Sequence, residues 1–273
     1  MKKISLYLAG AALAGAAVFC FFAPAFLAEK AEAVSIGEVT SFQLPYGAGG
    51  RMCQDLAWDG TYLWCVDSDT HGDVPEIIKI YYDEVAGTGT VVGGFEIIAE
   101  PELHKGLAWD GTYLLTAWGG WPKGRIYEID PGNPGAEPSF IELDFPFPYG
   151  LAFHYVPGGA GYLWTVTNDA GYVYQLNRDN GTTVGTPFNV TADIGAERKP
   201  AGLAFDGEYL WLAAFGKNDR IFQYTAGGSL VDSFPAYTNQ PHATGVTWDD
   251  DGDYLWYVDC CTDTFYRIKI LFE

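Results

Sequence analysis

The chain has 273 residues, with 35 acidic side chains against 15 basic ones and a net charge of −20 at neutral pH. This charge argues against nucleic acid and anionic membranes as partners, and it is compatible with cationic ligands, calcium or simple solubility. The length is enough for one domain with a sizeable core.

Residues 1–33 predict a signal peptide. Two lysines precede an apolar stretch that runs to Leu27, and residues 31–33 offer a small-x-small cleavage site, with residues 23–25 as an alternative. The apolar run is also long enough to span a membrane, so an uncleaved anchor is the competing interpretation. We expect export to the periplasm, the cell surface or the medium, with no membrane span once the signal is cleaved.

Residues 34–273 contain five copies of one short motif, each with a Gly-Leu-Ala-Trp-like segment, a turn and a Tyr-Leu-Trp-like segment. The common apolar position recurs every 43 to 52 residues, at Leu56, Leu107, Leu151, Leu203 and Val246. A repeat of this length, with two strands around a tight turn, is typical of a β-propeller blade. The sequence therefore predicts one all-β domain, a five-bladed β-propeller.

Each copy predicts four strands. The first is short and built of small residues, and the second is a continuous apolar run, as expected of a strand covered on both faces. Asp-Gly pairs at 59–60, 110–111 and 206–207 predict hairpin turns between them, because glycine tolerates the positive φ that such turns need. A third strand follows, and the fourth ends near a phenylalanine: Phe95, Phe140, Phe188 or Phe234.

The fifth copy reaches the end of the chain at Glu273 without room for a fourth strand. The missing pattern stands at the start of the domain, where the segment GEVTSFQLP contains Phe42. We expect this N-terminal strand to complete the last blade and close the ring, because closure leaves no unpaired outer edge.

Four cysteines follow the predicted signal peptide: Cys53, Cys65, Cys260 and Cys261. In an exported protein they are expected to form disulfides rather than catalytic thiols or zinc ligands. Counting back from the turn at 59–60 places Cys53 and Cys65 on one face of a hairpin. A Cys53–Cys65 bridge with a vicinal Cys260–Cys261 bridge fits, and so do two ways of cross-linking the first blade to the fifth. The sequence leaves the three pairings open, but in each of them no free thiol remains.

Function is expected on the face that carries the loops from fourth to first strands and from second to third strands. Three of the four histidines fall there, namely His71, His104 and His242, and with Asp67 and Asp69 they are the candidate acid–base residues. The candidate ligand-binding residues on this face are Trp118, Trp121, Gln54, Tyr149 and Asp169.

The two tryptophans flank a pair of glycines, an arrangement that favours stacking on a sugar ring, a peptide aromatic or a cationic group. Packing of Trp118 between blades is the alternative interpretation. The run 67–73 resembles the start of a calcium loop, with Asp67, Asp69 and Asp73 as candidate ligands. Ile78 stands where the bidentate glutamate of such a loop belongs, so a solvated acidic loop competes with calcium, the one cofactor that the sequence suggests.

The repeated pattern GLAWDG, YLW, IYxID and F resembles the broad superfamily of exported propellers that includes the NHL, gluconolactonase-like (SMP-30-like) and glutamine cyclotransferase-like proteins. The resemblance covers residues 34–273. Glutamine cyclotransferases are five-bladed, and their first blade begins Thr-Gln-Gly-Leu and continues Leu-Tyr-Glu-Ser-Thr-Gly. Here residues 53–56 and 63–68 are CQDL and LWCVDS, with Cys65 in place of that family's glutamate.

Two kinds of function fit these observations. The sequence contains no serine nucleophile elbow, zinc HExxH motif, phosphate loop or dinucleotide fingerprint. This favours an exported, monomeric binding module that holds a small molecule, peptide, sugar or protein at the channel mouth. The alternative is a propeller enzyme of the lyase, hydrolase or glutamine cyclotransferase type, which requires the aspartates and histidines to converge within hydrogen-bonding reach.

Overall fold

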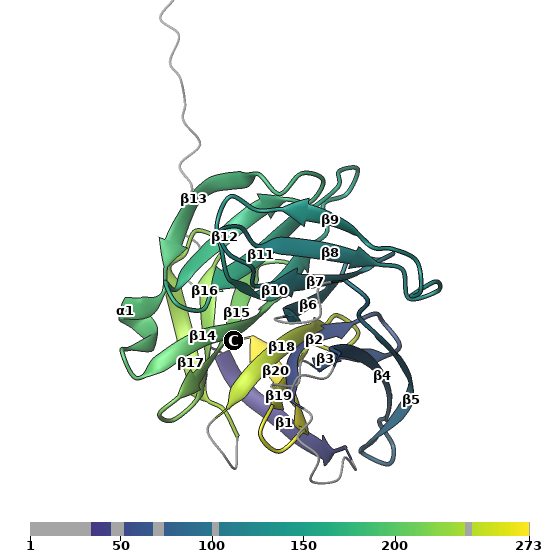
Figure 1. The fold of residues 1–273 in the computed structure, drawn as a ribbon. Helices are drawn as coiled ribbons and strands as arrows, with labels where there is room; N and C mark the ends of the chain where they lie inside the picture. Colours follow the sequence, from purple (N-terminus) through teal and green to yellow (C-terminus); the bar gives the residue numbers. More distant parts are fainter. Residues whose placement is uncertain (1–33, 45–51, 68–73, 100–103, 238–241, 273) are drawn as a thin grey trace, which may run out of the picture. The chain divides into compact units, whose positions relative to one another are not determined.

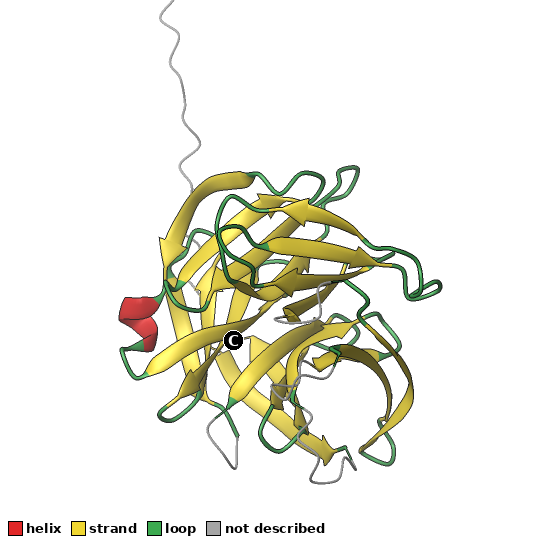
Figure 2. Cartoon of the chain, viewed as in Figure 1, coloured by secondary structure: helices red, strands yellow, loops and turns green. Residues whose placement is uncertain are grey.

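The structure is a computed structural model, and it describes residues 34–44, 52–67, 74–99, 104–237 and 242–272. In these ranges twenty β-strands and one short helix, α1 (Thr191–Ile194), are present, and the strands form five antiparallel four-stranded sheets (Figures 1 and 2). The described segments contain no helix long and apolar enough to cross a membrane. The predicted signal peptide lies outside the described residues.

Each sheet is one blade, and its strands follow one another from the inside outward. Blade one contains β2 (Cys53–Trp58), β3 (Leu63–Asp67), β4 (Glu76–Asp83) and β5 (Thr88–Glu96). Blade two contains β6 (His104–Trp109), β7 (Leu114–Trp118), β8 (Arg125–Ile129) and β9 (Ser139–Glu142). Blade three contains β10 (Pro148–His154), β11 (Tyr162–Thr167), β12 (Tyr172–Asn177) and β13 (Thr183–Asn189).

Blade four contains β14 (Arg198–Phe205), β15 (Tyr209–Gly216), β16 (Arg220–Thr225) and β17 (Leu230–Pro235). Blade five contains β18 (Ala243–Asp249), β19 (Tyr254–Asp259), β20 (Thr264–Phe272) and β1 (Val34–Gln43). The innermost strands β2, β6, β10, β14 and β18 contact one another in that order, and β18 returns to β2 (Figure 1). The five-bladed propeller predicted from the repeat is confirmed.

The last blade combines the two ends of the domain. Strand β1 pairs antiparallel with β20, and Phe42 lies opposite Phe265. The two rings are stacked with their centroids 5.0 Å apart, and Phe42 also stacks on Tyr82 of blade one at 5.6 Å. That this strand is what keeps the ring closed stays a prediction, for which a truncation is designed below.

The Asp-Gly hairpins form as predicted, and their aspartates act as caps. Gly60 has a φ of +89°, and the carboxylate of Asp59 accepts the backbone N–H groups of Thr61 and Tyr62 at 2.9 and 2.7 Å. The same arrangement recurs at Asp110 and Asp206. A short side-chain acceptor inside the turn satisfies donors that the ladder leaves open, so each turn fixes the register of its two strands.

The core lies between neighbouring blades. Every residue of β3 is buried, which confirms that the second strand is covered on both faces. Leu56 packs with Trp256 of blade five, whereas Ala57 packs with Leu107 of blade two. Successive side chains of an innermost strand thus face opposite neighbours, as the alternation of a β-strand requires.

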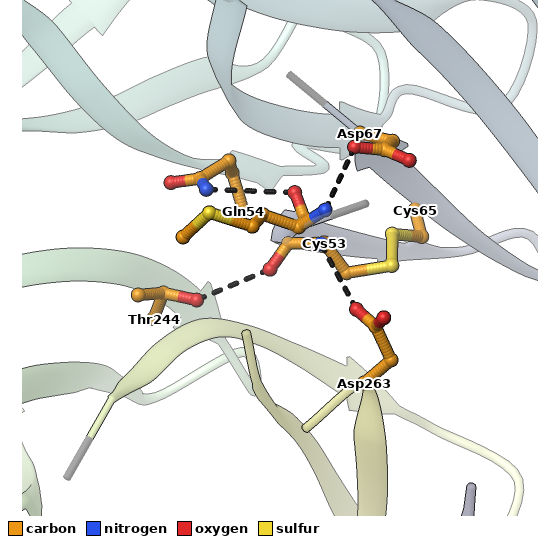
Figure 3. The surroundings of a disulfide bond; sticks show 7 residues. Cys53, Gln54, Cys65, Asp67, Thr244 and Asp263 are labelled. Carbon is orange, nitrogen blue, oxygen red and sulfur yellow. Dashed lines mark hydrogen bonds between the residues drawn. A yellow bond between two sulfur atoms is a disulfide. The ribbon is translucent and has the colours of Figure 1, made fainter. Parts of the chain in front are cut away.

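Only one of the predicted disulfides is present in the described residues. Cys53 and Cys65 are bridged within blade one, with their Cα atoms 5.8 Å apart (Figure 3). Cys260 is a buried thiol and Cys261 an exposed one. The expectation that all four cysteines are bridged is therefore wrong for Cys260 and Cys261. Because Cys53 and Cys65 pair with each other, no cysteine of blade one is left for them, and they are not bridged to each other.

Candidate functional site

The residue just before the common apolar position sets how closely the innermost strands approach. It is glycine in four blades: Gly106, Gly150, Gly202 and Gly245. A Cβ added at any of them would overlap the backbone of the neighbouring blade. Only glycine fits such an approach. Blade one departs from the pattern with Asp55.

Asp55 is fully buried, and its carboxylate reaches three other blades. Oδ2 accepts the backbone N–H groups of Leu107 and Leu151 at 3.0 and 3.2 Å, and Oδ1 accepts that of Val246 at 3.1 Å. The inner edge of each blade has no further strand beside it, so these buried N–H groups need another acceptor. Burial raises the pKa of Asp55 well above its usual range, and the three donated hydrogen bonds oppose that shift.

Sequence reasoning missed Asp55. The sequence does single it out: when the five copies are aligned on their common apolar position, the preceding residue is glycine in four copies and aspartate in the first.

The residue just before the glycine or Asp55 position lies at a shift in strand register in every blade. β-Bulges of this kind turn a side chain in a new direction and are frequent beside functional sites. The residues at this position, which we term the bulge ring, are Gln54, Lys105, Tyr149, Ala201 and Thr244.

The bulge ring converges near the centre of the propeller. The Tyr149 hydroxyl donates to Oε1 of Gln54 at 3.1 Å, and because blades one and three are not neighbours this bond crosses the middle of the ring. Gln54 and Thr244 are buried. The Thr244 hydroxyl donates to the carbonyl of Cys53 at 3.3 Å, beside the disulfide (Figure 3).

Burial also shifts the ionisation of this ring. It lowers the pKa of Lys105, and the carboxylate of Asp67 opposes this shift. It raises the pKa of Tyr149, so the phenol is a neutral donor at physiological pH. The ring therefore offers an amide, an ammonium, a phenol and a hydroxyl in a partly dehydrated position, where polar interactions are stronger than in water.

The predicted acid–base residues lie deeper than expected from loop positions. His104 is fully buried inside blade two, with Nδ1 3.3 Å from the Thr116 hydroxyl and Nε2 3.0 Å from the carbonyl of Ala99. Asp67 is buried and accepts the backbone N–H of Met52 at 2.9 Å. The ring of His242 stacks on that of Phe215, with centroids 5.8 Å apart.

The predicted ligand-binding aromatics differ in their surroundings. Trp118 packs against Gly120 and beneath the guanidinium of Arg125, whose Cζ lies 5.2 Å from the ring centroid. Trp121 is 74% exposed and stacks on Phe147 at 6.0 Å. Asp169 is an exposed partner of Lys199, at 3.5 Å.

The calcium hypothesis falls largely outside the described residues, because Asp69, His71 and Asp73 do so. In the ranges that the structure describes, no group of three or more histidine, cysteine, aspartate or glutamate side chains is placed to hold a metal ion. A calcium site that includes these residues stays a prediction.

Comparison with known proteins supports the fold. No family model and no curated protein sequence matches the chain. Among solved structures, the glutaminyl cyclase of Myxococcus xanthus has a TM-score of 0.61 at 12% identity, over 88% of this chain and 97% of that one. A luciferin-regenerating enzyme has a TM-score of 0.52 at 15% identity, over 85% of this chain and 95% of that one.

The periplasmic gluconolactonase of Pseudomonas aeruginosa has a TM-score of 0.46 at 15% identity, over 79% of this chain and 64% of that one. At these identities the likeness is one of fold. The resemblance noted in the sequence is confirmed at the level of the β-propeller fold by the first two of these structures.

Proposed function

We propose that the protein is an exported binding protein that holds a small ligand, bearing a carboxylate or amide oxygen, at the bulge ring. The observation that carries the proposal is the convergence of Gln54, Lys105, Tyr149 and Thr244 from four blades. The Cys53–Cys65 disulfide and the predicted signal peptide support export, since disulfides persist in oxidising compartments.

The ligand class follows from the donors. The lysine ammonium has three N–H donors and the glutamine amide has two, whereas the single protons of the Tyr149 and Thr244 hydroxyls are already donated to Gln54 and to the carbonyl of Cys53. Lys105 is the one cation of the bulge ring, and burial has lowered its pKa. A ligand carboxylate next to it would favour the charged ammonium, and the Gln54 amide N–H that is not directed at the Met52 carbonyl would orient the ligand.

The scaffold below the bulge ring is rigid. Asp55 follows Gln54 directly and joins blade one to blades two, three and five by hydrogen bonds. Positions fixed in this way keep the ring donors at constant spacing, as a binding site requires.

Thermal shift tests this proposal. The probes are a panel of free amino acids, N-acetyl amino acids, dipeptides and hydroxy acids, added to the wild type and to Lys105→Met. We expect at least one of these acids to raise the Tm of the wild type and to leave that of Lys105→Met unchanged. The matched control is Lys199→Met, which removes an exposed lysine of blade four and should keep the response. No shift with any probe, or an equal shift in Lys105→Met, would contradict the proposal.

An enzyme of the glutamine cyclotransferase type is the second candidate. The likeness to the Myxococcus xanthus glutaminyl cyclase and the match of CQDL to that family's first blade favour it. Cys65, in place of the family's glutamate, is fully buried and disulfide-bonded, so it offers no acid–base group. We therefore expect no ammonia release from glutaminyl dipeptides above the blank. Release that is lost in Lys105→Met would establish the enzyme instead.

A further inference from the structure

The hairpin turns between first and second strands lie on the face of the propeller opposite the bulge ring. Residues of all five blades enclose a cavity of about 450 Å³ there, a volume in the range of small-molecule sites. The residue two positions after the common apolar residue is aromatic in every blade and lines this cavity: Trp58, Trp109, Phe153, Phe205 and Trp248.

The rim of this cavity is acidic. Its charged residues are Asp59, Asp206, Asp250 and Asp251, and no lysine or arginine is among the described residues that line it. The carboxylates are held in place, because Asp59 and Asp206 accept the indole N–H groups of Trp64 and Trp211 at 2.7 and 2.8 Å. The indole of Trp248 likewise donates to Asp250, whose pKa is raised by burial and by Asp249 and Asp251. A cation would relieve this crowding of negative charge.

His154 lines the same cavity in the column where the other four blades have aspartate. Its ring packs on that of Phe205, with centroids 4.3 Å apart. Burial lowers the pKa of His154, so the imidazole is neutral at pH 7 and does not repel a cation. Its Nδ1 is buried and has no hydrogen-bond partner within the described part of the chain.

The residues that line the cavity indicate which kind of cation it would bind. The carboxylates are distributed around the rim, and among the described residues no three potential ligands are grouped to hold a metal ion. Aromatic faces, tryptophan above all, attract ammonium groups through the charge distribution of the ring, and surrounding carboxylates add to this attraction. We propose that this cavity binds organic ammonium ions, small amines or quaternary ammonium compounds with an apolar body.

Matched ligands test the proposal by calorimetric titration of the wild type. Choline and benzyltrimethylammonium are the probes, and 3,3-dimethyl-1-butanol is the neutral isostere of choline. We expect saturable binding of both cations and at least about tenfold weaker binding of the isostere, since a desolvated cation–π contact accounts for such a factor. Added salt should weaken the binding of the cations but not that of the alcohol.

Matched variants locate the site. The double variant Asp250→Asn, Asp251→Asn should lower the affinity for choline about tenfold, because it removes two carboxylate charges of the rim, whereas Asp144→Asn should not change it. Asp144 has a 96% exposed side chain and lies in the loop before β10, on the bulge-ring face. Tyr155→Ser removes a rim aromatic that is 67% exposed, so it weakens binding without threatening the fold.

Several outcomes would overturn this inference: no saturable binding of either ammonium ion, equal binding of the isostere, equal losses in the two aspartate variants, or saturation by calcium in their place. Lys105→Met should keep full affinity for choline. The result is therefore independent of the ligand proposed for the bulge ring.

Discussion

The hairpin aspartate carries more than one hydrogen bond in the blades that have it. In blades one and four it caps two backbone N–H groups and also accepts the indole N–H of the second-strand tryptophan. Blade three has His154 in that position, and there Nε1 of Trp164 is buried without a partner among the described residues. In blade five Asp249 is instead 3.3 Å from the guanidinium of Arg267.

Asp206→Ala is therefore expected to destabilise the propeller by about 2 kcal/mol, because two backbone donors and the Trp211 indole lose their acceptor together. Urea unfolding measures this loss. Asp179→Ala removes an exposed turn aspartate of blade three and should change the unfolding free energy by less than about 0.5 kcal/mol. Equal losses in the two variants would mean that the Asp206 bonds contribute nothing.

Asp55 has a distinct pH signature. Its pKa in the folded protein is raised, so the folded state binds this proton more tightly than the unfolded state does. The stability from this linkage is fully present below the unfolded pKa of about 4 and is lost as the pH rises through the folded pKa. We expect wild type to gain stability relative to Asp55→Asn as the pH falls from 7 toward 4, in urea unfolding at a series of pH values. A constant difference would contradict the shift.

Asp55→Ala leaves three buried N–H groups without their acceptor at all pH values. We expect it to lose about 3 kcal/mol at pH 7, since each buried donor without a partner is costly. The same urea experiment measures this loss, and a variant as stable as the wild type would show that water replaces the carboxylate.

At the scale of single elements, the cysteines of the first hairpin are bridged, whereas those of the β19–β20 turn are not. The β2–β3 hairpin brings Cys53 and Cys65 together, whereas Cys260 and Cys261 lie in the turn after β19 and remain thiols. Burial raises the pKa of Cys260 to about 12, which makes this thiol unreactive in the folded protein.

Thiol titration of the domain that begins at residue 34 should find two thiols after unfolding without reductant. In the folded protein only Cys261 should react quickly with a thiol reagent, because Cys260 is buried. A titration that finds none would establish the vicinal bridge, and peptides linked from blade one to blade five in mass spectrometry would establish cross-linking.

At the scale of the whole molecule, the repeat predicted most of the fold because each blade is built from local signals. The Asp-Gly turns and the buried second strands follow from residues close in sequence. Asp55 does not, because its carboxylate serves donors of three other blades, and that proximity exists only after the ring has formed. His104 was expected at the mouth, but its ring turns into blade two and contacts that of Tyr127.

The bulge ring and the cavity on the hairpin face also show what the sequence alone does not predict. Gln54 and Tyr149 were predicted as ligand residues from their loop face, and a hydrogen bond between them crosses the centre of the ring. The cavity of the hairpin face was not expected, because Trp58 and its four counterparts look like blade packing in the sequence. They do pack between blades, and they also line the cavity. The same five aromatic residues thus pack between blades and line the cavity, and the second role becomes visible only in the assembled ring.

Closure of the ring by β1 can be tested by truncation. Phe42 is buried between Phe265 of blade five and Tyr82 of blade one, and the Thr40 hydroxyl lies 3.2 Å from that of Tyr82. Deleting residues 36–46 removes these contacts and leaves β20 as an open edge, so we expect a loss of stability far larger than that from trimming a loose terminus.

Single substitutions in β1 measure how much of its contribution to stability comes from the packing of Phe42. Phe42→Ala should cost about 3 to 4 kcal/mol, as large-to-small changes at buried aromatics do. Val39→Ala, on the same strand but 38% exposed, should stay within about 0.5 kcal/mol of the wild type. Thermal and urea unfolding measure all three variants. A truncated protein that melts like the wild type would show that the five blades hold together without β1, and the ring would then be closed by the contact of β18 with β2 alone.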